Sequence, residues 1–325
     1  MTSSVSNLGL QLLSINNLQS EQVNLAQLNE ELGSGQQQDN LTKYAPTTAI
    51  NLMNFQNSIT QKQAYLGTMQ TVQARLTIYN QTMGDMENIA AQAGSLATNN
   101  QSLNPSNVAQ LQAQVQSYLK QLTSDLNQQV GGRYIYAGTR YSTTPVVDLS
   151  TLSGTPSWPF TPTTSPTLPN YDSEYNPPTT TTDASAFTQD SVTIDNNFSV
   201  QYGITSNSAA FQQLVAGLQF INAATQSGVS AATYQTDMSN AGSLLTTALT
   251  GIQALNTNVA SNQNILKQET TTQNADISTL QSQISDLQQV NVAQVGAEIN
   301  TLQTQLQASY SATASLEQLS ILKYL

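Results

Sequence analysis

Proline most constrains what this chain can fold into, because it is almost confined to one stretch. Eight of the ten prolines lie between Pro145 and Pro178, and only Pro46 and Pro105 lie outside that stretch. Proline breaks the interior of a helix, since it lacks a backbone donor and its ring clashes with the preceding turn. The two long arms on either side of the proline-rich stretch are therefore able to form long helices.

The N-terminal arm carries apolar residues at helical spacing, and Gly33 and Gly35 end its first helical run. Steps of three, four and seven predict that the apolar residues before Gly33 share one stripe of a helix. They are Leu8, Leu12, Ile15, Leu18, Leu25, Leu28 and Leu32. A second helix is predicted over about 47–97 and a third over 108–129. The apolar stripe of the second helix consists of Met53, Ile59, Leu66, Met69, Val72, Leu76, Tyr79 and Met83.

The C-terminal arm repeats this pattern. Ser206 is the predicted N-cap of a short amphipathic helix, and a much longer helix is predicted over about 230–287. Apolar residues then alternate in steps of three and four, but the phase of the alternation shifts by one near residues 289–291. A slip of this kind turns the apolar stripe or breaks the helix, so we expect a joint there.

The middle of the chain, residues 134–202, has a different period. Residues 191–202 alternate with period two and contain β-forming side chains, and Asp195-Asn-Asn197 is typical of a hairpin turn. The Ser, Thr and Pro stretch over 142–182 is too polar to pack a large core. We therefore expect a small β-rich insertion decorated by surface loops.

These patterns predict a mainly α protein. Its predicted architecture is an elongated rod of paired N- and C-terminal coiled-coil helices and a helical bundle, with an inserted small β-rich domain. The predicted parts are an N-terminal assembly helix (1–45), the two halves of a helical core (46–133 and 206–289), the inserted outer domain (134–205) and a C-terminal assembly helix (290–325).

Composition excludes most catalytic chemistry. The chain has no cysteine and no histidine, which removes thiol nucleophiles, imidazole bases and the usual zinc ligands. We predict no catalytic residue, no cofactor and no metal site. Only 8% of the residues are charged, and the 8 basic ones are scattered, so nucleic acid is not an expected partner. No apolar run reaches the length of a membrane span, and the N-terminal residues lack the pattern of a cleavable signal peptide.

Long leucine-rich helices at both ends need partners along their whole length. A helix of ~30 residues is about 45 Å long, and two such helices that pair with each other still expose apolar flanks. We therefore predict that the terminal helices form an assembly interface. Its predicted residues are Leu8, Leu12, Ile15, Leu18, Leu25, Leu302, Leu306, Leu316, Leu319, Leu322 and Leu325.

Several segments resemble the flagellin and hook-associated protein family, and their order along the chain matches that family. Leu28-Asn-Glu-Glu-Leu-Gly-Ser-Gly35 is similar to the family's N-terminal helix stop. Val130-Gly-Gly-Arg-Tyr-Ile-Tyr-Ala-Gly-Thr139 resembles a segment of the junction proteins that filament flagellins usually lack. Residues 200–214 resemble the return into the helical core, and Leu316-Glu-Gln-Leu-Ser-Ile-Leu-Lys-Tyr-Leu325 resembles the closing segment of the junction proteins.

Two joints depart from the family pattern. Acidic residues that the family often carries there are replaced by Lys43-Tyr-Ala-Pro46 after the first helix and by Val290-Asn-Val292 near the C-terminal joint. These changes affect the local contacts of the joints rather than the fold.

The resemblance implies an extracellular structural subunit at the hook–filament junction of the bacterial flagellum. It implies export through the flagellar type III pathway without a cleaved signal peptide. The implied partners are further copies of the chain in a ring or tube, hook-associated protein 1 on the hook side, flagellin on the filament side, and an export chaperone before secretion. Neither nucleic acid nor a membrane is among the expected partners.

Two other functions stay open at this point. A filament flagellin would share the terminal helices, although the segment Arg133–Thr139 argues against it. A surface adhesin or glycan-binding protein would use the aromatic side chains of the insertion, which are Trp158, Phe160, Tyr171 and Tyr175.

Overall fold

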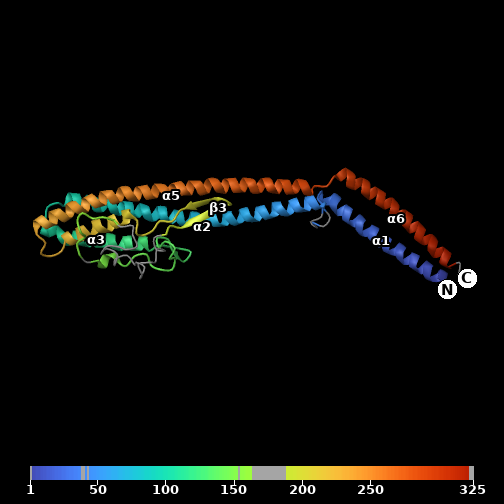
Figure 1. The fold of residues 1–325 in the computed structure, drawn as a ribbon, viewed down its shortest axis with the longest axis horizontal. Helices are drawn as coiled ribbons and strands as arrows, with labels where there is room; N and C mark the ends of the chain where they lie inside the picture. Colours follow the sequence, from blue (N-terminus) through green and yellow to red (C-terminus); the bar gives the residue numbers. More distant parts are fainter. Residues whose placement is uncertain (1, 38–40, 42–43, 153, 163–187, 322–325) are drawn as a thin grey trace. The chain divides into compact units, whose positions relative to one another are not determined.

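The computed structural model describes residues 2–37, 41, 44–152, 154–162 and 188–321 (Figure 1). The fold is mainly α, with two antiparallel sheets of two strands each in the described residues. The chain divides into two compact units. Met1–Thr60 and Ala275–Leu325 form the first unit, and Gln61–Asn274 form the second.

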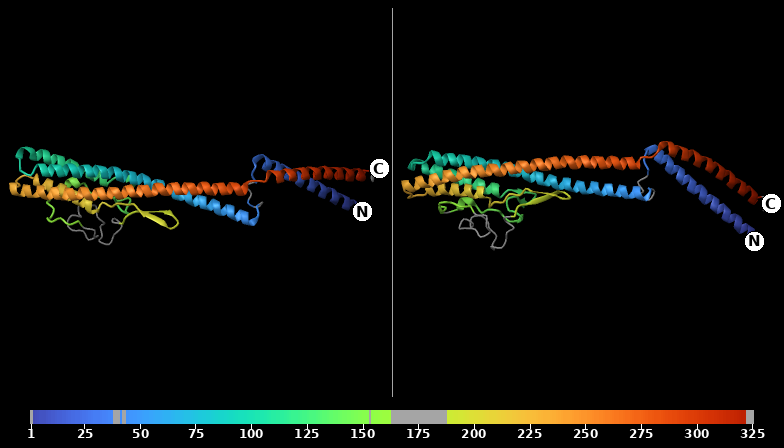
Figure 2. Two further views of the ribbon diagram at one scale, coloured as in Figure 1. Left: turned by 90° about the horizontal axis from the view of Figure 1, so that it is seen from above. Right: turned by 45° about the horizontal axis from the view of Figure 1, so that its top comes forward.

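The first unit is built on the two terminal helices. Helix α1 (Thr2–Ser34) and helix α6 (Val292–Ile321) lie side by side with the two chain ends at the same end of the pair (Figures 1 and 2). They therefore run antiparallel, and the predicted pairing of the N- and C-terminal helices is confirmed.

Two short links next to this pair are joined by backbone hydrogen bonds. Helix α1 ends at Ser34, and Gly35 follows with a φ of 70°, a conformation that glycine adopts without strain. The amide of Gln37 donates to the carbonyl of Gln288 (2.8 Å), and the amide of Val290 donates to the carbonyl of Gly35 (3.1 Å). Gln36 and Gln289 form an antiparallel bridge between these bonds.

The predicted joint at residues 289–291 is confirmed. Helix α5 (Ala231–Gln288) ends before it and α6 begins at Val292. The side-chain oxygen of Asn291 accepts hydrogen bonds from the amides of Ala293 (3.1 Å) and Gln294 (3.2 Å), which satisfies two donors of the first turn of α6.

The second unit packs four helices around one apolar core. They are residues 61–99 of α2 (Pro46–Asn99), α3 (Pro105–Leu126), α4 (Ala209–Ala224) and residues 231–274 of α5. Helix α4 is buried on nearly all sides. In the core, the ring of Tyr136 makes edge-to-face contacts with Tyr79 (4.9 Å between centroids) and Phe211 (5.6 Å).

Two β-hairpins flank this core. Strands β1 (Gln129–Val130) and β2 (Arg133–Tyr134) are joined by two glycines with φ of 60° and 77°. Strands β3 (Ser191–Asp195) and β4 (Phe198–Gln201) enclose a turn at Asn196 and Asn197, so the predicted hairpin is confirmed. Apart from one short 3₁₀ helix, Leu149–Thr151, the remaining described residues between β2 and β3 are loop.

Three local predictions need correction. The third helix begins at Pro105 rather than residue 108, because Asn104 caps it and proline is favoured in the first turn. The N-cap of α4 is Ser208, not Ser206. Ser206 is buried, and its amide donates to the carbonyl of Tyr136 (2.9 Å), so it lies in a turn that precedes the helix. Met53 of the predicted α2 stripe is 49% exposed.

Candidate assembly interface

The contact between α1 and α6 is an apolar seam. Leu18 on α1 and Leu306 on α6 are buried, and Leu25 packs against a small cluster that contains Val295 and Ile299. We call these five residues the inner seam. Their steps of seven, four and seven keep each set on one side of its helix. Of the predicted interface residues, Leu18, Leu25 and Leu306 are therefore used within the chain.

Polar contacts complete the pairing of the two helices. The hydroxyls of Ser14 and Thr313 are 2.7 Å apart, and Gln22 donates to the hydroxyl of Tyr310. The hydroxyl of Ser309 donates to Glu21 Oε1 (3.4 Å), while Glu21 Oε2 is buried with no hydrogen-bond partner in the described residues. A seam that mixes apolar and polar layers specifies register, but it stabilises a two-helix pair only modestly.

A second set of apolar residues on α1 has no cover in the described chain. Leu12 is 55% exposed, Ile15 is 44% exposed and Val23 is 64% exposed. We call these three residues the outer stripe. Counting 100° per residue, they lie on a different side of α1 from Leu18 and Leu25. Large apolar side chains gathered on one exposed helix face are typical of an interaction surface.

The prediction that Leu8 to Leu32 share one stripe is therefore wrong. Each three-residue step rotates the side chain by about −60° relative to the previous one, and two such steps in succession, from Leu12 to Ile15 to Leu18, carry the pattern around the helix. The structure consequently separates Leu12 and Ile15 from Leu18 and Leu25. Val23 also belongs to the outer stripe. Its place in the pattern was missed, because it follows Ile15 by eight residues and the position halfway between them on the same face is a glutamine, Gln19.

The other predicted interface residues lie at the limits of the described structure. Leu8, Leu316 and Leu319 lie in helices α1 and α6, but their side chains are outside the description. Leu322 and Leu325 lie outside the described residues. Their role in assembly stays a prediction.

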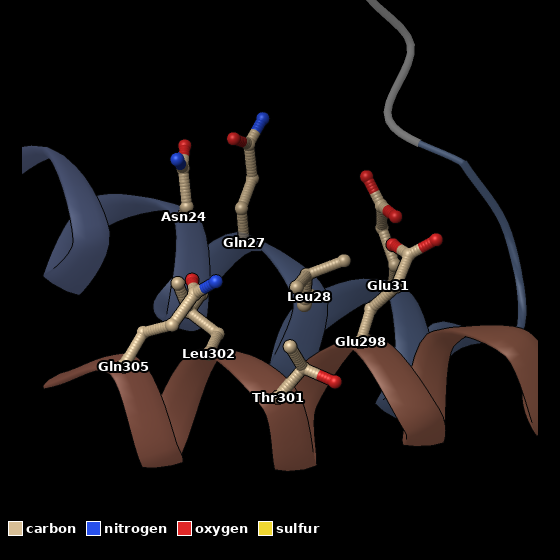
Figure 3. Close-up of a pocket in the computed structure, with 8 residues that line it drawn as sticks. All are labelled: Asn24, Gln27, Leu28, Glu31, Glu298, Thr301, Leu302 and Gln305. Atoms are coloured by element: carbon tan, nitrogen blue, oxygen red, sulfur yellow. The ribbon is translucent and has the colours of Figure 1, made fainter. Parts of the chain in front are cut away.

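A groove flanks the inner seam (Figure 3). It has a volume of about 420 Å³ and takes one wall from α1 and the other from α6. Leu302, which was predicted as an interface residue, lies in it together with Leu28. Glu31 and Glu298 line the same end of the groove, and we call it the acidic groove. Sequence reasoning missed it, because no pattern within either helix shows that these two carboxylates meet.

No three side chains of the types His, Cys, Asp and Glu gather in the described part of the chain in a way that could hold a metal ion. No helix there combines the length and apolar character that a membrane span requires. The ring of Trp158 packs edge-to-face on Phe220 (5.9 Å), whereas Tyr171 and Tyr175 lie outside the described residues.

The carboxyl group of Asp125 loses its proton less readily than an ordinary aspartate. Burial, with a contribution from the nearby Asp85, raises the pKa of Asp125 from 3.8 to about 7. Asp125 Oδ2 is buried and has no hydrogen-bond partner in the described residues. Asp125 lies in the last turn of α3 between Leu122 and Leu126, which are both fully buried. That apolar setting was the signal in the sequence that could have identified it.

The raised pKa of Asp125 makes the stability of the second unit depend on pH. The carboxyl of Asp125 ionises near pH 4 in the unfolded chain and near pH 7 in the folded chain. Its ionisation therefore does not lower the free energy of unfolding below pH 4, lowers it increasingly as pH rises, and has its full destabilising effect above pH 7. Asp125→Asn should therefore stabilise the protein at pH 8 by about 1–2 kcal/mol, after allowance for solvent screening of a half-buried group. Urea unfolding at pH 4 and pH 8 checks this, and an equal effect at both pH values would contradict it.

Comparison with known proteins shows that the C-terminal region of the chain is similar to a known family. Residues 243–325 match the model of the bacterial flagellin C-terminal helical region. The match covers the last quarter of the chain, which is therefore similar to the C-terminal helical region of bacterial flagellins. The matched residues include the C-terminal part of α5 and all of α6, so they supply one helix of the inner seam.

Solved structures show where this fold recurs. A putative flagellar hook-associated protein from Vibrio parahaemolyticus is 14% identical and superposes with a TM-score of 0.50, over 74% of this chain and 98% of that one. Bacillus cereus FlgL is 15% identical, with a TM-score of 0.39, over 70% of this chain and 98% of that one. No curated protein sequence matches this chain. At this level of identity, the Vibrio structure is evidence for the fold only.

Proposed function

We propose that the chain is a hook-associated protein 3, a subunit that joins the flagellar hook to the filament. The observation that carries this proposal is the outer stripe. The inner seam is satisfied by α1 and α6 within one chain, whereas Leu12, Ile15 and Val23 stay exposed. Burying each of these side chains against a neighbouring subunit would contribute about 1.5–3 kcal/mol. The terminal helices would thus assemble copies of the chain into a ring or tube.

The segment Arg133–Thr139 favours a junction protein over a filament flagellin. It resembles a segment of the junction proteins, and in this chain its residues Ile135, Tyr136 and Ala137 are buried in the second unit. Tyr136 is fully buried between Tyr79 and Phe211. Gly138 has a φ of 61°, which other residues rarely adopt. The tight packing of this segment supports the interpretation that the second unit is built like that of a junction protein.

The proposal includes the partners and location of such a subunit. On the hook side the chain would contact hook-associated protein 1, and on the filament side it would contact flagellin. Before secretion it would bind an export chaperone and pass unfolded through the flagellar type III pathway, with its signal left uncleaved. A chain without cysteine suits this route, since no disulfide can form before or after export.

Deletion of the gene tests the junction role directly. Cells that lack the chain should keep their hooks but release flagellin into the medium, because the filament has no surface on which to start. Electron microscopy of the cell surface and immunoblots of the medium measure both results. Restoring the gene should restore filaments, whereas normal filaments in the deletion strain would refute the junction role.

A filament flagellin would behave differently. Purified flagellin of the filament type polymerises into long filaments, and a junction subunit does not. Long filaments grown from the purified chain alone would therefore favour the alternative.

A further inference from the structure

The second unit contains a groove lined by two of the chain's three arginines. The groove has a volume of about 400 Å³ and lies along α2, where Ala64, Gly67, Thr68 and Thr71 recur at helical spacing. Arg75 follows on the same helix and Arg133 enters from β2. We call this the arginine groove. Small side chains over two turns leave room for the side of another helix rather than for a single small ion.

Both guanidinium groups are held in place by tyrosine side chains. The guanidinium carbon of Arg133 lies 4.4 Å from the centre of the Tyr141 ring, a contact that orients the planar group. Arg75 Nη1 donates to the hydroxyl of Tyr202 (2.6 Å). Arg75 Nε is buried and has no acceptor among the described residues.

Asp190 lies in the same groove but is bound to tyrosines instead. Its Oδ1 accepts a hydrogen bond from the hydroxyl of Tyr141 (2.6 Å), and its Oδ2 accepts one from Tyr202 (3.5 Å). The bond to Asp190 also raises the pKa of Tyr141. In the described parts of the chain, neither arginine of the groove forms an ion pair with a carboxylate. Two preoriented arginines that make no direct ion pair keep donors available for further carboxylates.

The first unit carries a groove of the opposite sign. In the acidic groove, Glu31 and Glu298 line one end between α1 and α6 (Figure 3). Glu298 Oε1 accepts a hydrogen bond from the amide group of Gln294 (3.1 Å), a neutral partner. Neither carboxylate pairs with a basic side chain of the described residues. The two grooves have similar volumes, about 400 and 420 Å³, and both are open to a partner.

We propose that the arginine groove of one copy of the chain binds the acidic groove of a second copy, with Arg75 and Arg133 facing Glu31 and Glu298. The contact uses two different surfaces, so a bound pair of copies keeps one free groove of each sign and can continue the assembly. Charge complementarity favours a second copy, because the chain itself presents a groove lined by two arginines and a groove lined by two glutamates. This inference rests on the proposed assembly of copies in the flagellum.

Cysteine cross-linking tests which surfaces meet, because the chain itself contains no cysteine. Thr71→Cys labels the arginine groove and Thr301→Cys labels the acidic groove, and both threonines are exposed. Flagella from cells that produce both variants together should give a cross-linked dimer with a short bismaleimide reagent. Either variant alone should give none. Thr236→Cys, at an exposed threonine of α5 outside both grooves, is the matched control for Thr71→Cys.

Charge reversal then tests the chemistry. Arg133→Glu in the Thr71→Cys chain should lower the dimer yield at least tenfold, and Glu298→Arg in the Thr301→Cys chain should restore it. Flagella that contain both variants but give no dimer would overturn this inference and leave the proposed function standing. A cross-link within one chain, or a yield unchanged by Arg133→Glu, would also overturn it. Absence of the chain from flagella would overturn the proposed function, and this inference with it.

Discussion

Aspartate at both Ile15 and Val23 should remove the chain from flagella while leaving it folded. Both side chains belong to the outer stripe and are 44% and 64% exposed, so the isolated chain loses little packing when they are replaced. In an assembled subunit each substitution would remove about 1.5–3 kcal/mol of burial and would place a charge in an apolar contact. Immunoblots of isolated flagella measure incorporation, which should fall more than a hundredfold.

A matched control separates the effect of position from that of charge. Asn17→Asp with Ser20→Asp adds the same two charges to exposed positions of α1 away from the outer stripe. That variant should enter flagella normally. Circular dichroism should show the same helix content in both double variants. If the Ile15 and Val23 variant incorporates as well as the control, the outer stripe is not an assembly surface.

Phe211→Ala should destabilise the second unit by about 3–5 kcal/mol. The ring of Phe211 is fully buried and meets Tyr136 edge-to-face, and Tyr136 in turn meets Tyr79. Removal of the ring leaves a cavity among side chains from α2, α4 and the segment after β2, which cannot all move inward together. Chemical unfolding followed by circular dichroism gives the loss of free energy.

Phe198→Ala is the control for that substitution. Phe198 is 46% exposed on β4, so the same change of residue type should cost less than about 1 kcal/mol. Equal losses for the two variants would show that the edge-to-face stack adds nothing to the core.

Much of this fold can be predicted from the helical spacing of apolar residues in the sequence. The joint at 289–291 is visible because the alternation of Ile284 and Leu287 with Val292 and Val295 breaks phase, and the structure ends α5 and begins α6 there. The turn at Asn196 and Asn197 is visible because a short polar pair separates two period-two runs. Both features are local, so their signals lie within about ten residues.

Contacts between distant segments carry no such signal. Leu12, Ile15 and Leu18 follow one another at equal steps of three residues, yet only Leu18 is buried. Which side of a helix is covered depends on the partner helix, which lies about 290 residues away along the chain. The acidic groove and the arginine groove are hidden for the same reason, since each combines side chains from segments that fold together only in three dimensions.

The bonded links at Gly35 and Val290 have a mechanical consequence. Two backbone hydrogen bonds and the bridge between Gln36 and Gln289 tie the segment after α1 to the segment before α6. A load applied to either terminal helix is therefore shared by both segments, and residues 35–37 cannot separate from residues 288–290 until these bonds break. In a subunit subjected to the rotation of a flagellum, these hydrogen bonds would limit how far the two segments at the base of the helix pair can be pulled apart.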